Sequence, residues 1–135
     1  HQRSADLFDA AAANADPLAA LRDLLSFLFD GLKGAAALGA GRVNVQGWGE
    51  ALVNPRVGAT VREVMDSSVQ ALALVVGKAQ DADQIRASLD PVAVSQLLLS
   101  AYYGLELQLA LNPDVDVDHY AAVVKVLLRS LSPQV

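Results

Sequence analysis

The sequence lacks cysteine altogether, and it has only one tryptophan, one methionine and 5% aromatic residues. Without cysteine there is no disulfide framework, no thiolate metal site and no thiol catalysis, and the chain suits a reducing compartment. With so few aromatic rings, the core must be built mainly from Leu, Val and Ala. The 135 residues are 53% hydrophobic and 19% charged, which is typical of one globular domain with a core of its own.

Basic residues are also scarce, because 10 Lys and Arg face 15 Asp and Glu and leave a net charge of −5. Phosphate binding needs clustered positive charge, so this balance argues against the chain holding nucleic acid by itself. No segment resembles a signal peptide. Residues 92–111 are long enough to span a membrane, but they contain too many polar side chains for lipid. These are Ser95, Gln96, Ser100, Glu106 and Gln108. We therefore expect a soluble, cytoplasmic protein.

The sequence contains repeated signals for the beginnings of helices. No segment alternates like a β-strand for long, and "RVNVQ" is the only hint of one. Asp-Pro and Asn-Pro pairs recur at 16–17, 54–55 and 90–91, where the first residue can cap a helix and the proline can occupy its first position. Apolar residues then follow the helical period. The predicted helices are 4–14, 17–33, 35–54, 55–80, 91–111 and 117–131. The predicted fold class is all-α, a multi-helix bundle in a single domain at 1–135.

The predicted helix at 35–54 is a weak one, because four glycines each cost up to about 1 kcal/mol relative to alanine in a helix interior. These glycines are Gly39, Gly41, Gly47 and Gly49. Gly34, just before them, is expected to end the preceding helix. A helix loosened in this way is a sensible place for a ligand to enter or for ligand-driven movement.

The helix at 91–111 is apolar on two sides, so it must be buried on two sides. In a short chain, one side can pack on its own domain and the other on a second copy. Together with helix 117–131 it would form an intermolecular four-helix bundle in a homodimer. The alternative is a helix at the centre of a monomer. The expected dimer interface consists of Leu98, Ala101, Tyr102, Leu105, Leu109, Val124, Leu127 and Leu128.

Motifs for catalysis are missing. His119 is the only histidine apart from His1, and we expect it to be solvated, so no Ser-His-Asp arrangement is available. The segment "GAGRVN" at 39–44 lacks the third glycine and the preceding strand of a dinucleotide-binding loop. We expect no enzyme activity and no cofactor.

A calcium loop is also excluded. The segment "DVDVDH" at 114–119 resembles the start of one, but His119 and Lys125 stand where a glycine and a glutamate are needed. A better role for Asp116 or Asp118 is to cap the helix that follows. We expect no metal.

Binding remains as a function, because the central helices carry an apolar wall with a few polar groups, which is typical of a small-molecule pocket. The expected ligand is a small apolar effector. The expected ligand-binding residues are Asn44, Trp48, Leu52, Met65, Ser68, Leu72 and Tyr103. Alternatives stay open for three of them. The Ser68 hydroxyl can bond to the carbonyl of Val64, and Trp48 and Met65 can be ordinary core.

Glu106 is a polar interruption between the two apolar sides of its helix, next to Tyr102 and Tyr103. It can serve as a pocket carboxylate that favours a cationic ligand. Alternatively, it can pair with Lys125 or Arg129 at the dimer interface. The sequence favours the interface.

Three segments resemble the regulatory domain of TetR-family (tetracycline-repressor-type) transcription regulators. "WGEALVNPRVGATVREV" at 48–64 resembles that family's Trp-x-Glu-Ala-x-x-x-Pro passage into its long helix. "GKAQDADQIRASLDPVAVSQLLLSAYYGL" at 77–105 resembles its turn into the first dimerisation helix, with Asp83 where glycine is usual. "DVDHYAAVVKVLLRSL" at 116–131 resembles its closing helix.

This resemblance implies the effector-binding and dimerisation domain of a transcriptional repressor, in which a small apolar ligand modulates DNA binding. The family begins with about 50 residues of helix-turn-helix DNA reader, which this sequence does not contain. DNA is therefore expected as a partner only through such an upstream domain, and no membrane is expected as a partner. A stand-alone dimeric helical binding or scaffold protein stays open as the alternative.

Overall fold

The computed structural model describes residues 2–133, with side chains from residue 5 onward, and it confirms the all-α prediction. No strand occurs in the described part of the chain, and the "RVNVQ" segment is helical. The helices are α1 (Gln2–Ala13), α2 (Pro17–Ala37), α3 (Ala40–Val53), α4 (Pro55–Asp81), α5 (Pro91–Leu111) and α6 (Val117–Arg129).

Side-chain caps begin four of the helices, as the sequence predicts. Asp16 accepts a hydrogen bond from the backbone N–H of Ala19 at 3.1 Å, and Asp90 accepts one from Val92 at 3.0 Å. Asn54 caps α4 in the same way, and each of these three helices has proline in its first turn. Asp116 caps α6, which agrees with the capping role predicted for this acidic segment. These caps occupy backbone donors that have no partner inside the helix.

Gly34 does not end α2, contrary to the prediction. The helix continues to Ala37, because one glycine inside a helix costs only about 1 kcal/mol. The break comes at Gly39, whose φ of 70° lies in the left-handed region that glycine adopts without strain. Among the described residues no single helix is both long and apolar enough to cross a membrane; α2 and α3 pass such a test only as a pair, bent by 100° at this break.

Asp83 stands where the TetR family, which the sequence resembles, usually has glycine, and its backbone is unusual. Its φ is 58°, which makes it the one described residue other than glycine with a positive φ. Aspartate tolerates this region better than most residues. The turn after α4 thus keeps a glycine-like backbone without glycine.

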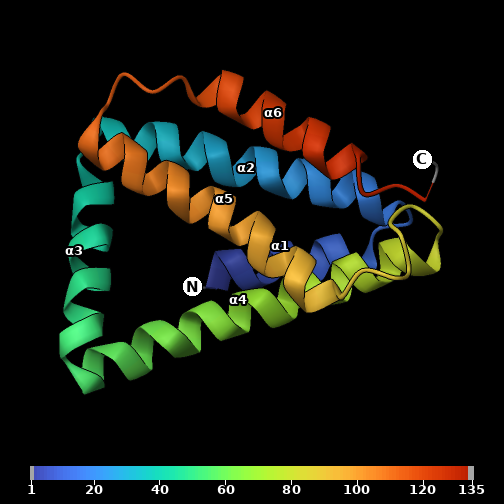
Figure 1. Cartoon of the computed structure of the whole chain (residues 1–135), viewed down its shortest axis with the longest axis horizontal. Coiled ribbons are helices and arrows are strands. Elements are labelled where there is room, and N and C mark those ends of the chain that lie inside the picture. Colours follow the sequence, from blue (N-terminus) through green and yellow to red (C-terminus); the bar gives the residue numbers. More distant parts are fainter. Residues whose placement is uncertain (1, 134–135) are drawn as a thin grey trace.

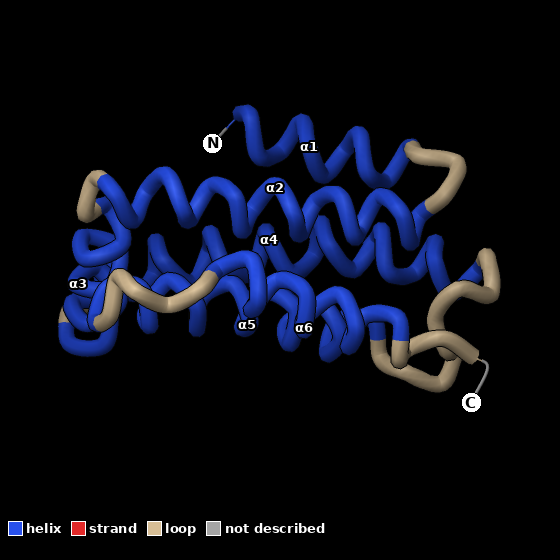
Figure 2. Tube along the Cα trace, turned by 90° about the horizontal axis from the view of Figure 1, so that it is seen from above, coloured by secondary structure: helices blue, strands red, loops and turns tan. Residues whose placement is uncertain are grey.

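Helix α6 runs along α2, and α5 crosses below them (Figure 1). Helices α3, α4 and α5 form the sides of a triangle, with α3 standing across one end of the molecule (Figure 1). Helix α1 packs on α2 and α4, on the side away from α5 and α6 (Figure 2). This arrangement leaves one face of α5 and α6 without a covering helix.

The core lies where α2, α4 and α5 meet, and it is made mainly of aliphatic side chains. Leu21, Val75 and Leu105 have no exposed surface, and each contributes roughly 1.5–3 kcal/mol by its burial. The ring of Phe29 joins α2 to α6 by an edge-to-face contact with Tyr120, with ring centres 5.8 Å apart. Helix α3 contributes no buried residue, so it is the helix held least firmly by apolar packing.

Candidate functional site

A buried carboxylate marks the contact between α3 and α5. Glu106, in the middle of α5, is only 3% exposed. One of its oxygens accepts a hydrogen bond from the side-chain amide of Asn44 on α3, at 2.6 Å. No described residue forms an ion pair with Glu106, although burying a carboxylate without a cation is costly.

An aromatic cluster lies on the same two helices. The ring of Trp48 on α3 meets Tyr103 on α5 edge to face at 5.6 Å, and Tyr103 meets Tyr102 at the same distance. Burial raises the pKa of both tyrosine phenols, and the nearby negative charge of Glu106 raises it further. The Ser68 hydroxyl on α4 interacts with Tyr103 and lowers its pKa. The two tyrosines therefore lie close enough to the carboxylate to be affected by its charge.

The predicted ligand-binding residues divide into two groups in the structure. Asn44, Trp48 and Tyr103 come together at the contact of α3 with α5, and Ser68 reaches Tyr103 from α4. The Ser68 hydroxyl also donates to the carbonyl of Val64 at 3.0 Å, which is the alternative role that the sequence left open for it. The other predicted residues lie elsewhere. Leu72 is buried in the core, Met65 is half-buried, and Leu52 is 88% exposed on α3.

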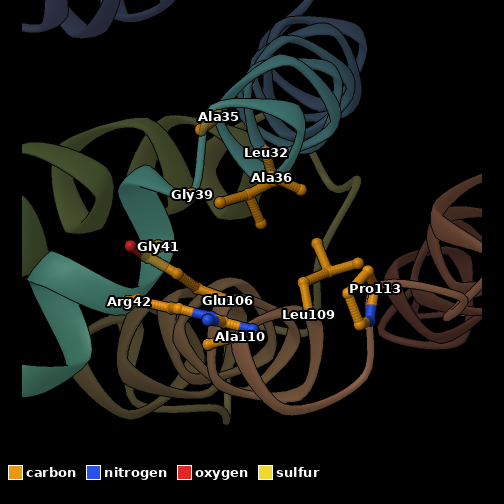
Figure 3. Close-up of a pocket in the computed structure, with 10 residues that line it drawn as sticks. All are labelled: Leu32, Ala35, Ala36, Gly39, Gly41, Arg42, Glu106, Leu109, Ala110 and Pro113. Atoms are coloured by element: carbon orange, nitrogen blue, oxygen red, sulfur yellow. The ribbon is translucent and has the colours of Figure 1, made fainter.

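A cavity of about 170 Å³ opens on the other side of Glu106. Its walls come from the end of α2, the start of α3 and the last turns of α5 (Figure 3). The lining residues are Leu32, Ala35, Ala36, Gly39, Gly41, Arg42, Glu106, Leu109, Ala110 and Pro113. Of these, Glu106 was offered from the sequence as a pocket carboxylate, and Gly39 and Gly41 lie in the segment expected to admit a ligand; the other lining residues were not predicted. Their one signal is the run of small residues from Ala35 to Gly41, which leaves room between helices.

The interface role favoured for Glu106 does not agree with its burial inside its own protomer. Its side chain points inward, and neither Lys125 nor Arg129 pairs with it in the described structure. The reason is geometric, because α6 packs on α2 and not along the part of α5 that carries Glu106. The alternative of a pocket carboxylate agrees with its position.

The uncovered face of α5 and α6 forms an apolar groove of about 400 Å³. Five of the predicted interface residues line it: Leu98, Ala101, Val124, Leu127 and Leu128. Leu97 and Leu131 also line it and were missed, although Leu97 is 66% exposed. Tyr120 joins the two helices, because its hydroxyl donates to the carbonyl of Ala101 at 2.5 Å.

Three predicted interface residues lie away from this groove. Leu105 has no exposed surface and Leu109 is 7% exposed, because both point toward the core of their own protomer. Tyr102 is half-buried beside Tyr103. A helical wheel groups Leu98 with Leu105 and Leu109, but of these three buried residues only Leu98 lines the groove.

The remaining polar motifs have structural roles. His119 is exposed and lies 3.2 Å from Asp116, within the first turn of α6. Lys33 and Asp118 form an exposed ion pair at 2.7 Å that connects α2 to α6. The described residues contain no group of three or more His, Cys, Asp or Glu side chains placed to hold a metal ion.

A family model described as the C-terminal domain of BetI-type transcriptional repressors matches residues 17–133. The chain belongs to this family. It is therefore the C-terminal, effector-binding and dimerisation part of a TetR-family regulator, as the three sequence segments implied. No curated protein and no solved structure gives a significant match to the chain.

Proposed function

We propose that the domain works as a homodimer in which a small ligand controls DNA binding by a helix-turn-helix segment upstream. The observation that carries the dimer is the apolar groove between α5 and α6. Leu97 and Leu127 are 66% and 58% exposed there, and the floor is made of Leu98, Val124 and Leu128. Exposed apolar surface of this kind on two adjacent helices favours a second copy, which would complete a four-helix bundle.

The same helix serves both proposed activities. Helix α5 contributes Leu97 and Ala101 to the groove and, further along, Glu106 and Leu109 to the cavity. A ligand that binds one arrangement of α3 against α5 more tightly shifts the population toward that arrangement. In the dimer, such a shift changes the separation of two DNA readers, which must match half-sites about one helical turn apart. Such a repressor acts in the cytoplasm, where its operator is.

The dimer is tested by a charge placed in the groove. Leu127→Glu should convert the dimer to a monomer, because a carboxylate buried in an apolar interface lacks a partner. Leu74→Glu is the matched control, since Leu74 is 66% exposed on α4, away from the groove. Sedimentation equilibrium gives the mass of each variant, and circular dichroism shows that each is folded.

The mass of the Leu127→Glu variant decides whether the groove is the dimer interface. A dimeric Leu127→Glu variant, or a monomeric wild-type chain, contradicts the proposal. In a repressor that carries the DNA reader, Leu127→Glu should also weaken operator binding strongly, because one reader alone contacts one half-site. Unchanged operator binding by a monomeric variant would show that dimerisation through this groove is not needed to bind DNA, and would contradict the proposed role of the dimer.

A further inference from the structure

The buried carboxylate of Glu106 has one hydrogen-bond partner and no countercharge. Its first oxygen accepts from Asn44, and no described residue donates a hydrogen bond to its second oxygen. Glu106 is only 3% exposed, yet it lines a cavity. Glu106 is also the only charged residue in the buried part of the described structure. A bound cation would supply the missing partner.

The cavity next to it sets the size and character of that cation. Its volume of about 170 Å³ has room for roughly six water-sized groups. The walls beside Glu106 are aliphatic, with Leu32 and Leu109 as the largest side chains. Figure 3 shows the Glu106 side chain extending from the α5 wall toward Gly41 at the start of α3. A short alkyl chain with one charged end matches this combination of one carboxylate and apolar walls.

The lining also distinguishes between kinds of cation. None of the residues that line the cavity is aromatic, so it lacks the cage of rings that holds a quaternary ammonium group. Trp48 and Tyr103 contact each other and are not part of the lining. A carboxylate oxygen that receives no hydrogen bond from the described residues can accept one from a ligand, and a charged N–H donor gives the strongest. A primary ammonium group supplies such donors and a quaternary one does not.

Arg42 is the other charged residue of the lining. It is exposed at the start of α3 and extends toward the α5 wall, without forming an ion pair with Glu106 (Figure 3). Because Arg42 is an exposed residue, its repulsion of a bound cation is screened by solvent. Removing it should therefore strengthen the binding of a cation slightly.

We propose that this cavity binds a small primary amine as its ammonium ion, with Glu106 accepting the N–H groups and the aliphatic walls holding the alkyl chain. The inference names the ligand class for the proposed effector function and so depends on it. It also narrows the apolar effector expected from the sequence to an amphipathic one. Asn44 then reports on the site, since its amide shares the carboxylate with the ligand.

The test compares three probes with the same number of heavy atoms: n-butylammonium, tetramethylammonium and n-butanol. The whole chain is titrated with each probe, and binding is measured by calorimetry and by the NMR signals of the Asn44 side-chain amide. These measurements should show binding of n-butylammonium. The other two probes should bind about tenfold more weakly or worse, because they lack N–H donors or charge. Equal binding of all three probes, or no binding of n-butylammonium, overturns the proposal.

Glu106→Gln removes the charge and keeps the shape of the side chain, so it should lower the affinity for n-butylammonium about tenfold or more. Glu63→Gln is its control, because it changes the net charge equally at an exposed position on α4. Arg42→Gln should bind n-butylammonium at least as well as the wild type. A loss of binding in the Glu63 or Arg42 variant, or none in the Glu106 variant, contradicts the assignment. A dimer that binds no amine would refute this inference alone, whereas a monomer would refute the proposed function.

Discussion

The position of α3 depends on the close approach of Gly58, at the start of α4, to the backbone of Ala51 on α3. Adding a methyl group at Gly58 tests this dependence. A Cβ atom at this glycine would lie 2.6 Å from the backbone oxygen of Ala51, roughly 1 Å closer than an optimal contact. The corner cannot relax easily, because two backbone hydrogen bonds hold it. The N–H of Asn54 donates to the carbonyl of Glu50 at 2.8 Å, and the N–H of Gly58 donates to the carbonyl of Asn54 at 2.8 Å. Overpacking of this kind typically costs about 1–3 kcal/mol.

The gain in helix propensity from alanine acts in the opposite direction but is smaller. It is at most about 1 kcal/mol in a helix interior, and Gly58 lies in the first turn of α4. We therefore expect Gly58→Ala to lower the free energy of unfolding by about 1–2 kcal/mol and the Tm by about 3–6 °C. It should also move the emission of Trp48, the single tryptophan, because α3 must shift against Tyr103.

Gly77→Ala is the matched control in the same helix. A Cβ there meets nothing within 4 Å, so only the propensity changes and stability should rise by about 0.5–1 kcal/mol. Urea denaturation followed by circular dichroism, at one protein concentration because the domain is proposed to be a dimer, compares the two variants. If Gly58→Ala is as stable as Gly77→Ala and leaves Trp48 emission unchanged, the corner is not the constraint described here.

Two further predictions concern α6. Tyr120→Phe removes the hydrogen bond to Ala101 and keeps the ring contact with Phe29, so it should cost about 1 kcal/mol in urea denaturation; an unchanged midpoint would show that this bond adds no net stability. The hydrogen bond from the His119 backbone holds the pKa of Asp116 below its ordinary value of 3.8. The ionised Asp116 therefore stabilises the fold above about pH 4, and this stability is lost as the pH falls through the lowered pKa. Asp116→Asn should therefore show a shallower loss of stability below about pH 4 in acid titrations, and a slope equal to that of the wild type would contradict this cause.

The beginnings of the helices could be predicted because their causes are local. An acidic or amide cap followed by proline specifies the first turn by itself, and Asp16, Asn54 and Asp90 all cap as expected. The end of α2 could not be predicted in this way. Gly34 and Gly39 are alike in sequence, and only the direction that the chain must take toward α3 decides which of them breaks the helix.

The candidate site was predicted only in part, because its residues meet through tertiary packing. Asn44, Trp48 and Tyr103 do converge, but their common partner is Glu106, which the pattern along α5 placed at an interface. A stripe on a helical wheel shows that a face is buried and not what buries it. The stripe containing Leu98 and Leu105 accordingly divides between the groove and the core of the protomer.

The contacts of α3 explain why a ligand at Glu106 would have effects beyond its own cavity. Helix α3 has no buried residue, and three specific contacts help to hold it: the hydrogen bond from the Asn44 amide, the ring contact of Trp48 and the close corner at Gly58. An ammonium ion that shares the carboxylate of Glu106 acts on the first of these, and the second lies one turn away on the same helix. Small changes in binding free energy can therefore displace α3, whereas the core of α2, α4 and α5 stays fixed by burial. The glycines that make α3 a poor helix are consistent with a segment whose position is set by polar contacts and so can be reset by a ligand.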